Sequence, residues 1–276
     1  ICIIPLEDSD KMLFAVDIGN TNVVIAVFDG DKIIQQWRVS SDDKRTGDEY
    51  TSMILTLCRD AGIDTSLFHK GIISSVVPAL IGPFVIVCQR IVKKHPYVIK
   101  TNLASEGSIL PVHLSQYSSR ELGTDLLCNA VAAWNVFKCA NIVVDFGTAL
   151  TLTATDSTGT ILGGTISPGL GTAVKALAMN TAQLPFVPLE APRKVIGATT
   201  KEAIQSGIVL GYKGLVESLV NKVRENMCEM SGDNPSEVKI IATGGLNSVL
   251  KPITECFTLV DKDLTVKGLK LISDLV

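Results

Sequence analysis

The sequence predicts an α/β fold made of two related lobes. Two observations lead to this prediction. A strand–turn–strand segment with Asp-x-Gly in its turn occurs twice, and alternating strand-like and helix-like stretches surround the two copies. Asp17 and Asp145 lie 128 positions apart, and so do Gly19 and Gly147. A repeat of this length is too long for a solenoid and indicates duplication of a whole domain.

The first Asp-x-Gly turn lies between two short apolar runs rich in Val, Ile and Phe, a composition typical of strands. Gly19 lacks a Cβ, so the backbone can approach a bulky anion closely. Donors for such an anion come from Asn20, Thr21 and Asn22. Asp17 can hold a divalent cation or its water shell, so the turn suits a nucleotide phosphate with its metal. An ordinary hairpin turn, in which Asn and Gly are common, is the alternative interpretation.

The second copy places Asp145, Gly147 and Thr148 after another apolar run, with an alternating, strand-like stretch behind them. Two such copies suggest that each lobe carries a phosphate loop. Farther along the chain, Gly244 and Gly245 follow another expected strand. A glycine pair at that point lets the backbone lie against a flat adenine ring, and a simple turn is the alternative.

The composition fits a folded protein with a sizeable core. Hydrophobic residues make up 46% of the 276 residues, and 25 Lys and Arg stand against 28 Asp and Glu, a net charge of −3. That balance gives no reason to expect a nucleic acid or a membrane as partner. The seven cysteines form no C-x-x-C pair. We therefore expect neither a zinc site nor a disulfide framework, but reduced thiols in a cytoplasmic protein.

The sequence contains no run long and apolar enough to predict a transmembrane helix. Residues 1–11 combine a short apolar patch with an acidic, polar piece and lack the basic start of a signal peptide. We interpret Met12 as the natural start and residues 1–11 as a leader or an added extension.

The first lobe is expected to contain three strands, then a helix, a strand, a helix and a strand. After the first turn these elements are a third strand at 33–39, a helix at 48–61, a strand at 71–77, a turn bracketed by Pro78 and Pro83, a helix at 84–92 and a strand at 97–100.

A helix is expected from Arg120 to Lys138, because its apolar residues lie on one broad face. Gly123, Thr124 and Asp125 fall in its first turn, where the field of a helix N-terminus favours the charged form of a carboxylate. Capping of this helix by Asp125 is the alternative to a functional role.

The second lobe is expected to continue with two helices after its three strands. The first, at 172–180, follows a glycine-rich turn and can direct amides at an anion. The second, at 199–225, contains Gly207, Gly211 and Gly214, whose absent side chains allow close helix packing. A strand at 238–242 and a short amphipathic helix at 266–275 complete the lobe.

In these motifs and their order the chain resembles the type III pantothenate kinases, a family of the acetate and sugar kinase, Hsp70 and actin superfamily. The matching segments extend from about Met12 to the C-terminus and include Asp17 to Asn22, Gly123 to Asp125, Asp145 to Thr148, Gly163-Gly164, Pro168 to Leu170, Thr181 to Pro185 and Thr243 to Gly245. No single motif is specific by itself, whereas their succession is.

The resemblance implies two ribonuclease-H-like, actin-like ATPase lobes related by internal duplication, at 12–128 and 129–276, with the active site between them. It implies ATP-dependent phosphorylation of pantothenate to 4'-phosphopantothenate, the first step of coenzyme A biosynthesis. The implied cofactors are Mg²⁺ and a monovalent cation, K⁺ or NH₄⁺, and the implied assembly is a homodimer.

The resemblance also implies roles for individual residues. Asp125 falls where these kinases place the catalytic carboxylate, Asp17 would hold Mg²⁺, and Asp145 would bind the monovalent cation. The expected ATP-binding residues are Gly19, Asn20, Thr21, Asn22, Gly147, Thr148, Gly244 and Gly245. The expected pantothenate-binding residues are Tyr117, Gly123, Thr124 and, from a partner subunit, Thr181.

One departure from the family pattern concerns the residue after Asp125. The family usually has arginine there, whose planar fork of donors suits a carboxylate, and this chain has Leu126. Two other hypotheses therefore stay open: a non-catalytic regulatory relative, and a kinase for another small acid or sugar.

Overall fold

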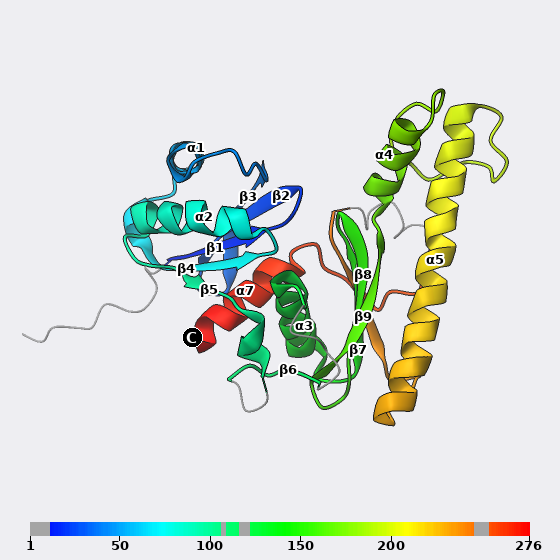
Figure 1. Ribbon diagram of the computed structural model, residues 1–276. Helices are drawn as coiled ribbons and strands as arrows, with labels where there is room; N and C mark the ends of the chain where they lie inside the picture. The colour runs from blue at the N-terminus through cyan, green and yellow to red at the C-terminus, as the bar shows by residue number, and fades with distance from the viewer. Residues whose placement is uncertain (1–11, 106–108, 116–121, 246–253) are drawn as a thin grey trace, which may run out of the picture. The chain divides into compact units, whose positions relative to one another are not determined.

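The computed structural model describes residues 12–105, 109–115, 122–245 and 254–276. The chain divides into two compact units, each with its own β-sheet (Figure 1). The first unit consists of Ile1–Leu110, Arg120–Val131 and Thr265–Val276, and the second of Pro111–Ser119 and Ala132–Leu264. The expectation for residues 1–11 lies outside the described residues.

The first unit is built on a five-stranded sheet in the order β3-β2-β1-β4-β5. Its central strand β1 pairs antiparallel with β2 and parallel with β4, so it has one neighbour of each kind. The strands are β1 (Met12–Ile18), β2 (Asn22–Asp29), β3 (Lys32–Ser40), β4 (Phe68–Ser75) and β5 (Tyr97–Val98).

Helices α1 (Gly47–Asp60) and α2 (Pro78–Ile91) pack on each other and share one apolar core with the first sheet (Figure 1). α1 starts one residue before the predicted start at residue 48, because Thr46 and Glu49 form a reciprocal capping box. Tyr50 from α1 and Phe84 from α2 stack at 4.6 Å between ring centroids in that core.

The turn predicted between Pro78 and Pro83 is wrong, because both prolines lie within α2. Pro78 occupies the first helical position, where its fixed φ fits and its missing N–H removes no intrahelical bond. Pro83 does remove one such bond. Burial of Leu80, Phe84 and Val87 on one face of the helix outweighs that loss.

The second unit contains a six-stranded sheet in the order β11-β10-β7-β8-β9-β6. Its strand β7 pairs antiparallel with β8 and parallel with β10, as β1 does with β2 and β4. Five strands therefore repeat the order of the first sheet, which confirms two ribonuclease-H-like lobes, and β6 is an addition. The strands are β6 (His113–Leu114), β7 (Asn141–Phe146), β8 (Ala149–Thr155), β9 (Thr160–Pro168), β10 (Lys239–Thr243) and β11 (Leu259–Val260).

Two further helices belong to the second unit, α4 (Leu170–Asn180) and α5 (Thr200–Ser231). α5 runs beside the second sheet (Figure 1) and shares an apolar core with β7, β8 and β10. It extends past the predicted end at residue 225 and stops at Gly232, which adopts the left-handed conformation that favours glycine.

Two more helices remain among the described residues, α3 (Thr124–Phe137) and α7 (Leu264–Leu275). The predicted boundary at residue 128 places all of α7 in the second lobe, whereas the structure groups it with the first unit from Thr265 onward. Gly268 explains this grouping, because a Cβ there would overlap the backbone of Cys128 in α3. Helix α7 therefore lies directly against the first turns of α3.

No helix in the described part of the chain is both long and apolar enough to span a membrane.

Candidate active site

Asp17 lies at the end of β1, the central strand of the first sheet, and its Oδ1 atom is enclosed by protein. On the parallel strand β4 its register partner is Ser74, whose side chain is fully buried. The hydroxyl of Thr124, the first residue of α3, lies 3.0 Å from the Ser74 hydroxyl. The end of β1 and the start of α3 therefore meet at the end of β4.

The turn after Asp17 is closed by a hydrogen bond from the Gly19 N–H to the Asn22 carbonyl at 3.0 Å. A Cβ on residue 19 would lie 3.2 Å from that carbonyl oxygen, which is closer than most side chains tolerate. Asn20 and Thr21 are exposed at the tip of this turn. The turn thus presents two exposed polar residues at its tip, while Ser41 donates hydrogen bonds to the Gly19 and Thr21 carbonyls behind it.

Asp125 occupies the second position of α3, and its Oδ1 accepts a hydrogen bond from the Leu126 N–H at 2.8 Å. A Cβ on Gly123 would overlap this same carboxylate oxygen. The glycine of the Gly-x-Asp motif therefore leaves room for the carboxylate of the motif itself.

Burial raises the pKa of Asp125, and the hydrogen bond from the Leu126 N–H opposes that shift without reversing it. Backbone hydrogen bonds at the start of α3 favour the charged carboxylate, in the predicted direction, but they do not decide the net shift. Loss of water from the carboxylate outweighs the field of the helix. A carboxylate with a raised pKa is a stronger base, which suits proton transfer near neutral pH.

Cys128, one turn farther along α3, lies close enough to Asp17 and Asp125 to be affected by the charges of both. Burial raises the pKa of its thiol well above the ordinary value, and the negative charges of Asp17 and Asp125 raise it further. Because both carboxylates act on one buried thiol, they belong to the same neighbourhood. No motif in the sequence marks Cys128 or Ser74 as part of this site.

In the second unit, Asp145 lies at the end of β7, with Thr243 on β10 as its register partner. Gly244 follows with a φ of +88°, a conformation that favours glycine. A Cβ on Gly244 would lie 2.6 Å from Asp145 Oδ1. The turn after Asp145 is closed by a hydrogen bond from the Gly147 N–H to the Ala149 carbonyl at 3.1 Å. Glycines thus surround this carboxylate and leave it room.

The start of α4 is fixed to the loop that follows Asp145. The Thr148 carbonyl accepts hydrogen bonds from the Gly169 N–H at 3.0 Å and from the Thr172 hydroxyl at 2.7 Å. A Cβ on Gly169 would overlap the Gly147 carbonyl oxygen. An exposed loop with a helix N-terminus beside it is a typical anion-binding arrangement. The role of Gly169 follows from this close contact, which the sequence motif alone does not reveal.

The structure brings four predicted residues together in the first unit and three in the second. Those in the first unit are Asp17, Gly123, Thr124 and Asp125, and those in the second are Asp145, Gly147 and Gly244. Thr181 stands apart from the second group, exposed at the opposite end of α4 from Gly169. Gly245 is exposed beside Gly244, and Tyr117 lies outside the described residues.

The expected metals can be compared with the ligands that the structure offers. The described residues contain no group of three or more His, Cys, Asp and Glu side chains that could hold a metal ion. Magnesium in kinases is usually held by one or two carboxylates together with water and the substrate's phosphates. The half-buried carboxylate of Asp17, which lies before the exposed Asn20–Thr21 tip, fits that requirement without further protein ligands.

Two ribonuclease-H-like lobes, each with an Asp-x-Gly turn after its central strand, define the class: the acetate and sugar kinase, Hsp70 and actin superfamily. Solved structures agree with this fold. A Campylobacter jejuni protein described as a Baf family transcriptional activator matches with a TM-score of 0.56 and 18% identity, covering 95% of this chain and 97% of that one. The ethanolamine utilization protein EutJ from Carboxydothermus hydrogenoformans matches with a TM-score of 0.53 and 12% identity, covering 97% and 91%. At these identities the likeness shows the fold alone.

The sequence comparisons narrow the class. The family model for type III pantothenate kinase matches residues 13–222. A type III pantothenate kinase from Paramagnetospirillum magneticum is 40% identical over 258 residues, which cover 94% of this chain and 95% of the relative. Another from Pelobacter propionicus is 36% identical over 261 residues, which cover 95% and 98%. The chain belongs to the type III pantothenate kinase family.

The raised pKa of Asp125 predicts that this residue reduces stability at neutral pH. The ionised carboxylate is less favourable in the fold than in the unfolded chain, so its cost is absent at low pH and complete above the folded pKa. We expect Asp125→Asn to raise the melting temperature at pH 7, and the gain to vanish below about pH 4, where the unfolded carboxyl is protonated.

Thermal melts of both proteins at pH 7 and at low pH measure this difference. Asp48→Asn is the matched control, because Asp48 occupies the same second position of α1 and is exposed, with only a surface ion pair to Arg90. A lower melting temperature for Asp125→Asn at pH 7 would contradict the inferred cost.

Proposed function

We propose that Asp125 is the catalytic carboxylate in the phosphorylation of pantothenate by ATP, the reaction of the family to which the chain belongs. The observation that carries this proposal is the position of Asp125 in the first turn of α3, at the strand end where Asp17 also lies. Phosphoryl transfer requires a positioned acceptor, a carboxylate near the accepting hydroxyl and neutralisation of the phosphate charge. Asp125 would orient or deprotonate the hydroxyl of pantothenate.

Asp17 would hold Mg²⁺ directly or through water. When bound, Mg²⁺ neutralises negative charge on the phosphates. The proposed phosphate contacts are Gly19, Asn20, Thr21 and Asn22 in the first unit, and Gly147 and Thr148 in the second. Gly244 and Gly245 would lie against adenine.

Gly123 and Tyr117 are proposed to lie near pantothenate, with Thr181 contributed by a partner subunit. Thr124 is a different case, because it is buried and its hydroxyl already makes three hydrogen bonds to β4. These bonds use the whole capacity of a hydroxyl and leave no position for a substrate.

Leu126 does not disturb the proposed catalytic residue. It holds Asp125 through its backbone N–H, which every residue except proline supplies. The lost arginine side chain therefore bears on recognition of the substrate's carboxylate and not on the geometry of Asp125. No feature of the described residues favours a regulatory relative or a kinase for another substrate.

The test of this proposal is the rate of ADP formation with pantothenate, ATP and Mg²⁺. Asp125→Asn keeps the shape of the side chain and removes the base, and general base catalysis typically contributes about 10²–10⁴-fold. We expect kcat to fall by roughly that factor while ATP binding, followed by calorimetry, survives. Asp48→Asn serves as the control and should retain the wild-type rate. An Asp125→Asn enzyme as fast as the wild type would remove Asp125 from the mechanism.

We also propose that Asp145 binds a monovalent cation, K⁺ or NH₄⁺. A carboxylate at a strand end, among the backbone carbonyls of the surrounding turn, offers the hard oxygen ligands that such a cation prefers. Binding of magnesium at Asp145, in parallel with Asp17, is the alternative.

Activity in K⁺ buffer is therefore expected to exceed that in Na⁺ buffer about tenfold or more, equivalent to ~1.4 kcal/mol of lost interaction. Asp145→Asn should abolish this difference by lowering the rate in K⁺. Equal rates of the wild type in the two buffers would refute the cation assignment.

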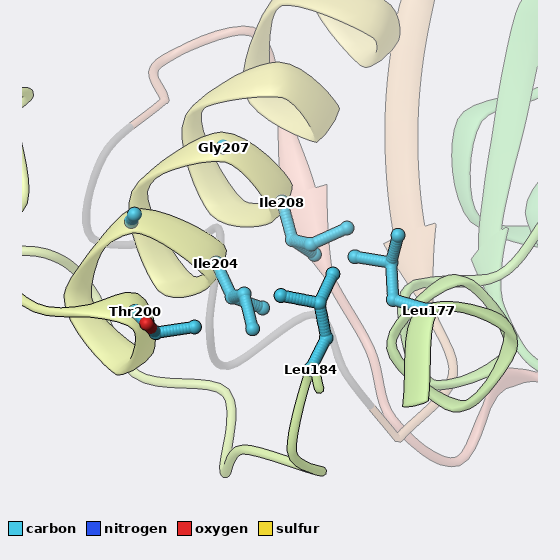
Figure 2. Close-up of a pocket in the computed structure, with 7 residues that line it drawn as sticks. Leu177, Leu184, Thr200, Ile204, Gly207 and Ile208 are labelled. Carbon is cyan, nitrogen blue, oxygen red and sulfur yellow. The ribbon is translucent and has the colours of Figure 1, made fainter. Parts of the chain in front are cut away.

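We propose a homodimer formed through α4 and α5. Between these helices lies an apolar hollow of about 410 Å³, into which Leu177, Leu184 and Ile208 point (Figure 2). Nearby, Ile196 is 87% exposed and Met179 is 82% exposed. Exposed apolar surface of this kind is typical of an interface between proteins.

The glycines of α5 support the same interface. Apart from the neighbouring backbone of α5 itself, no atom of the described residues lies within 4 Å of a Cβ built on Gly207, Gly211 or Gly214. The close helix packing predicted for these glycines is therefore not made with other described parts of the chain, and we assign it to a second copy. A dimer of this kind would also bring the exposed Thr181 near a partner.

Light scattering should therefore give a dimer mass at micromolar concentration. Ile196→Glu places a carboxylate in the proposed interface, and an unsatisfied buried charge costs about 1–3 kcal/mol or more. The dissociation constant should rise about tenfold or more. Leu55→Glu, on α1 of the first unit and 41% exposed, is the control that should leave the dimer intact. A wild-type monomer would overturn the assignment.

We propose the cytoplasm as the site of action. The six cysteines in the described part of the chain are all free thiols, which fits a reducing compartment that also supplies ATP.

A further inference from the structure

We propose that Thr124 is a positioning residue: its hydroxyl fixes the first turn of α3 to the end of β4 and thereby sets the place of the Asp125 carboxylate beside Asp17. This inference deepens the proposed function and rests on it, because it requires Asp125 to act in the reaction.

The contacts of the Thr124 hydroxyl determine the direction of each hydrogen bond. The hydroxyl donates to the Ser75 carbonyl at 3.1 Å and accepts from the Ser75 N–H at 3.0 Å. It also lies 3.0 Å from the Ser74 hydroxyl. Because a hydroxyl has one hydrogen and two lone pairs, Ser74 must be the donor in this last pair. The side chain of Thr124 is therefore saturated by two consecutive residues of β4.

The strand contacted by Thr124 is the parallel neighbour of the strand that carries Asp17. Ser74 is the register partner of Asp17, and Ser75 is that of Ile18. A further bond runs from the Val76 N–H to the Ile18 carbonyl at 3.0 Å. Thr124 thus ties the residue next to Asp125 to a backbone segment whose register with Asp17 is itself fixed.

Other contacts hold α3 but do not act at this point. Gly268 of α7 packs against Cys128, and the Thr265 hydroxyl donates to Asn129 Oδ1 at 2.8 Å. These contacts lie a turn or more beyond Asp125. Within the first turn of α3, the side-chain hydrogen bonds to β4 that the described residues show come from Thr124, which is adjacent to Asp125.

The chemical consequence concerns the rate of transfer rather than substrate affinity. A carboxylate that acts on an acceptor hydroxyl must lie within hydrogen-bonding distance, and a misplacement of about 1 Å can cost on the order of 10²-fold in rate. Thr124→Val keeps the shape of the side chain and removes the hydroxyl. We expect it to lower kcat about tenfold or more, with the KM for ATP within about twofold of the wild type.

Thr124→Ser restores the hydroxyl without the methyl group and should return kcat to within about threefold of the wild type. A looser first turn also exposes the carboxylate to more water. The acid limb of the pH–kcat profile should therefore move to lower pH in Thr124→Val and return in Thr124→Ser.

The matched control is Thr51→Val, since Thr51 is a buried threonine of α1 whose hydroxyl donates to the Gly47 carbonyl at 2.6 Å. It should lower the melting temperature while leaving kcat unchanged. Ser74→Ala removes the donor partner of Thr124 and should reproduce the fall in kcat, so it decides the question if Thr124→Val does not fold.

The outcomes separate this inference from the function on which it rests. A slow Asp125→Asn enzyme combined with normal kcat in Thr124→Val overturns the positioning role alone. If the Thr124→Val protein does not fold, normal kcat in Ser74→Ala has the same meaning. A Thr124→Ser enzyme as slow as Thr124→Val would show that the methyl group matters and the hydroxyl does not. An unimpaired Asp125→Asn enzyme overturns the catalytic assignment and the positioning role together.

Discussion

The arrangement of the site depends on the mixed pairing of the central strand in each sheet. β1 and β7 each have an antiparallel neighbour on one side and a parallel neighbour on the other. The antiparallel neighbour is joined by a short turn, which places polar residues directly after the aspartate. The parallel neighbour ends at the same edge of the sheet. Asp17 and Asp145 therefore each face a turn and a second strand end, where a hydroxyl residue is their register partner.

The two units share this arrangement of strands, but different residues surround the aspartate in each. In the first unit, Ser74 is bonded to the start of α3, so a second carboxylate joins the strand end. In the second unit, Thr243 is followed by Gly244, which adopts a positive φ and packs against Asp145. Two carboxylates thus lie near the end of β1, whereas a glycine turn packs against the single carboxylate at the end of β7. This difference accounts for the separate roles proposed for the two aspartates.

Hydrophobic periodicity and short motifs are local signals, and they were sufficient to predict both lobes and the strand ends that carry Asp17 and Asp145. Features that depend on distant contacts could not be predicted in the same way. Pro83 is tolerated in α2 because the helix is buried, and α7 joins the first unit because Gly268 fits against Cys128. Ser74 belongs to no motif, because its importance comes from its register with β1 and its bond to Thr124.

The ionisation of Asp125 also could not be predicted from local sequence, because its pKa depends on burial in the folded protein. Position in a helix predicts that the charged form is favoured, and burial, which only the folded structure reveals, reverses the net effect. Three neighbouring residues hold the carboxylate of Asp125 in place, although burial makes its charge unfavourable. Gly123 leaves space for the carboxylate, the Leu126 N–H holds one oxygen, and Thr124 ties the helix turn to β4. The raised pKa and the held position of Asp125 therefore have one origin, since the packing that buries most of the carboxylate also supplies the contacts that hold it.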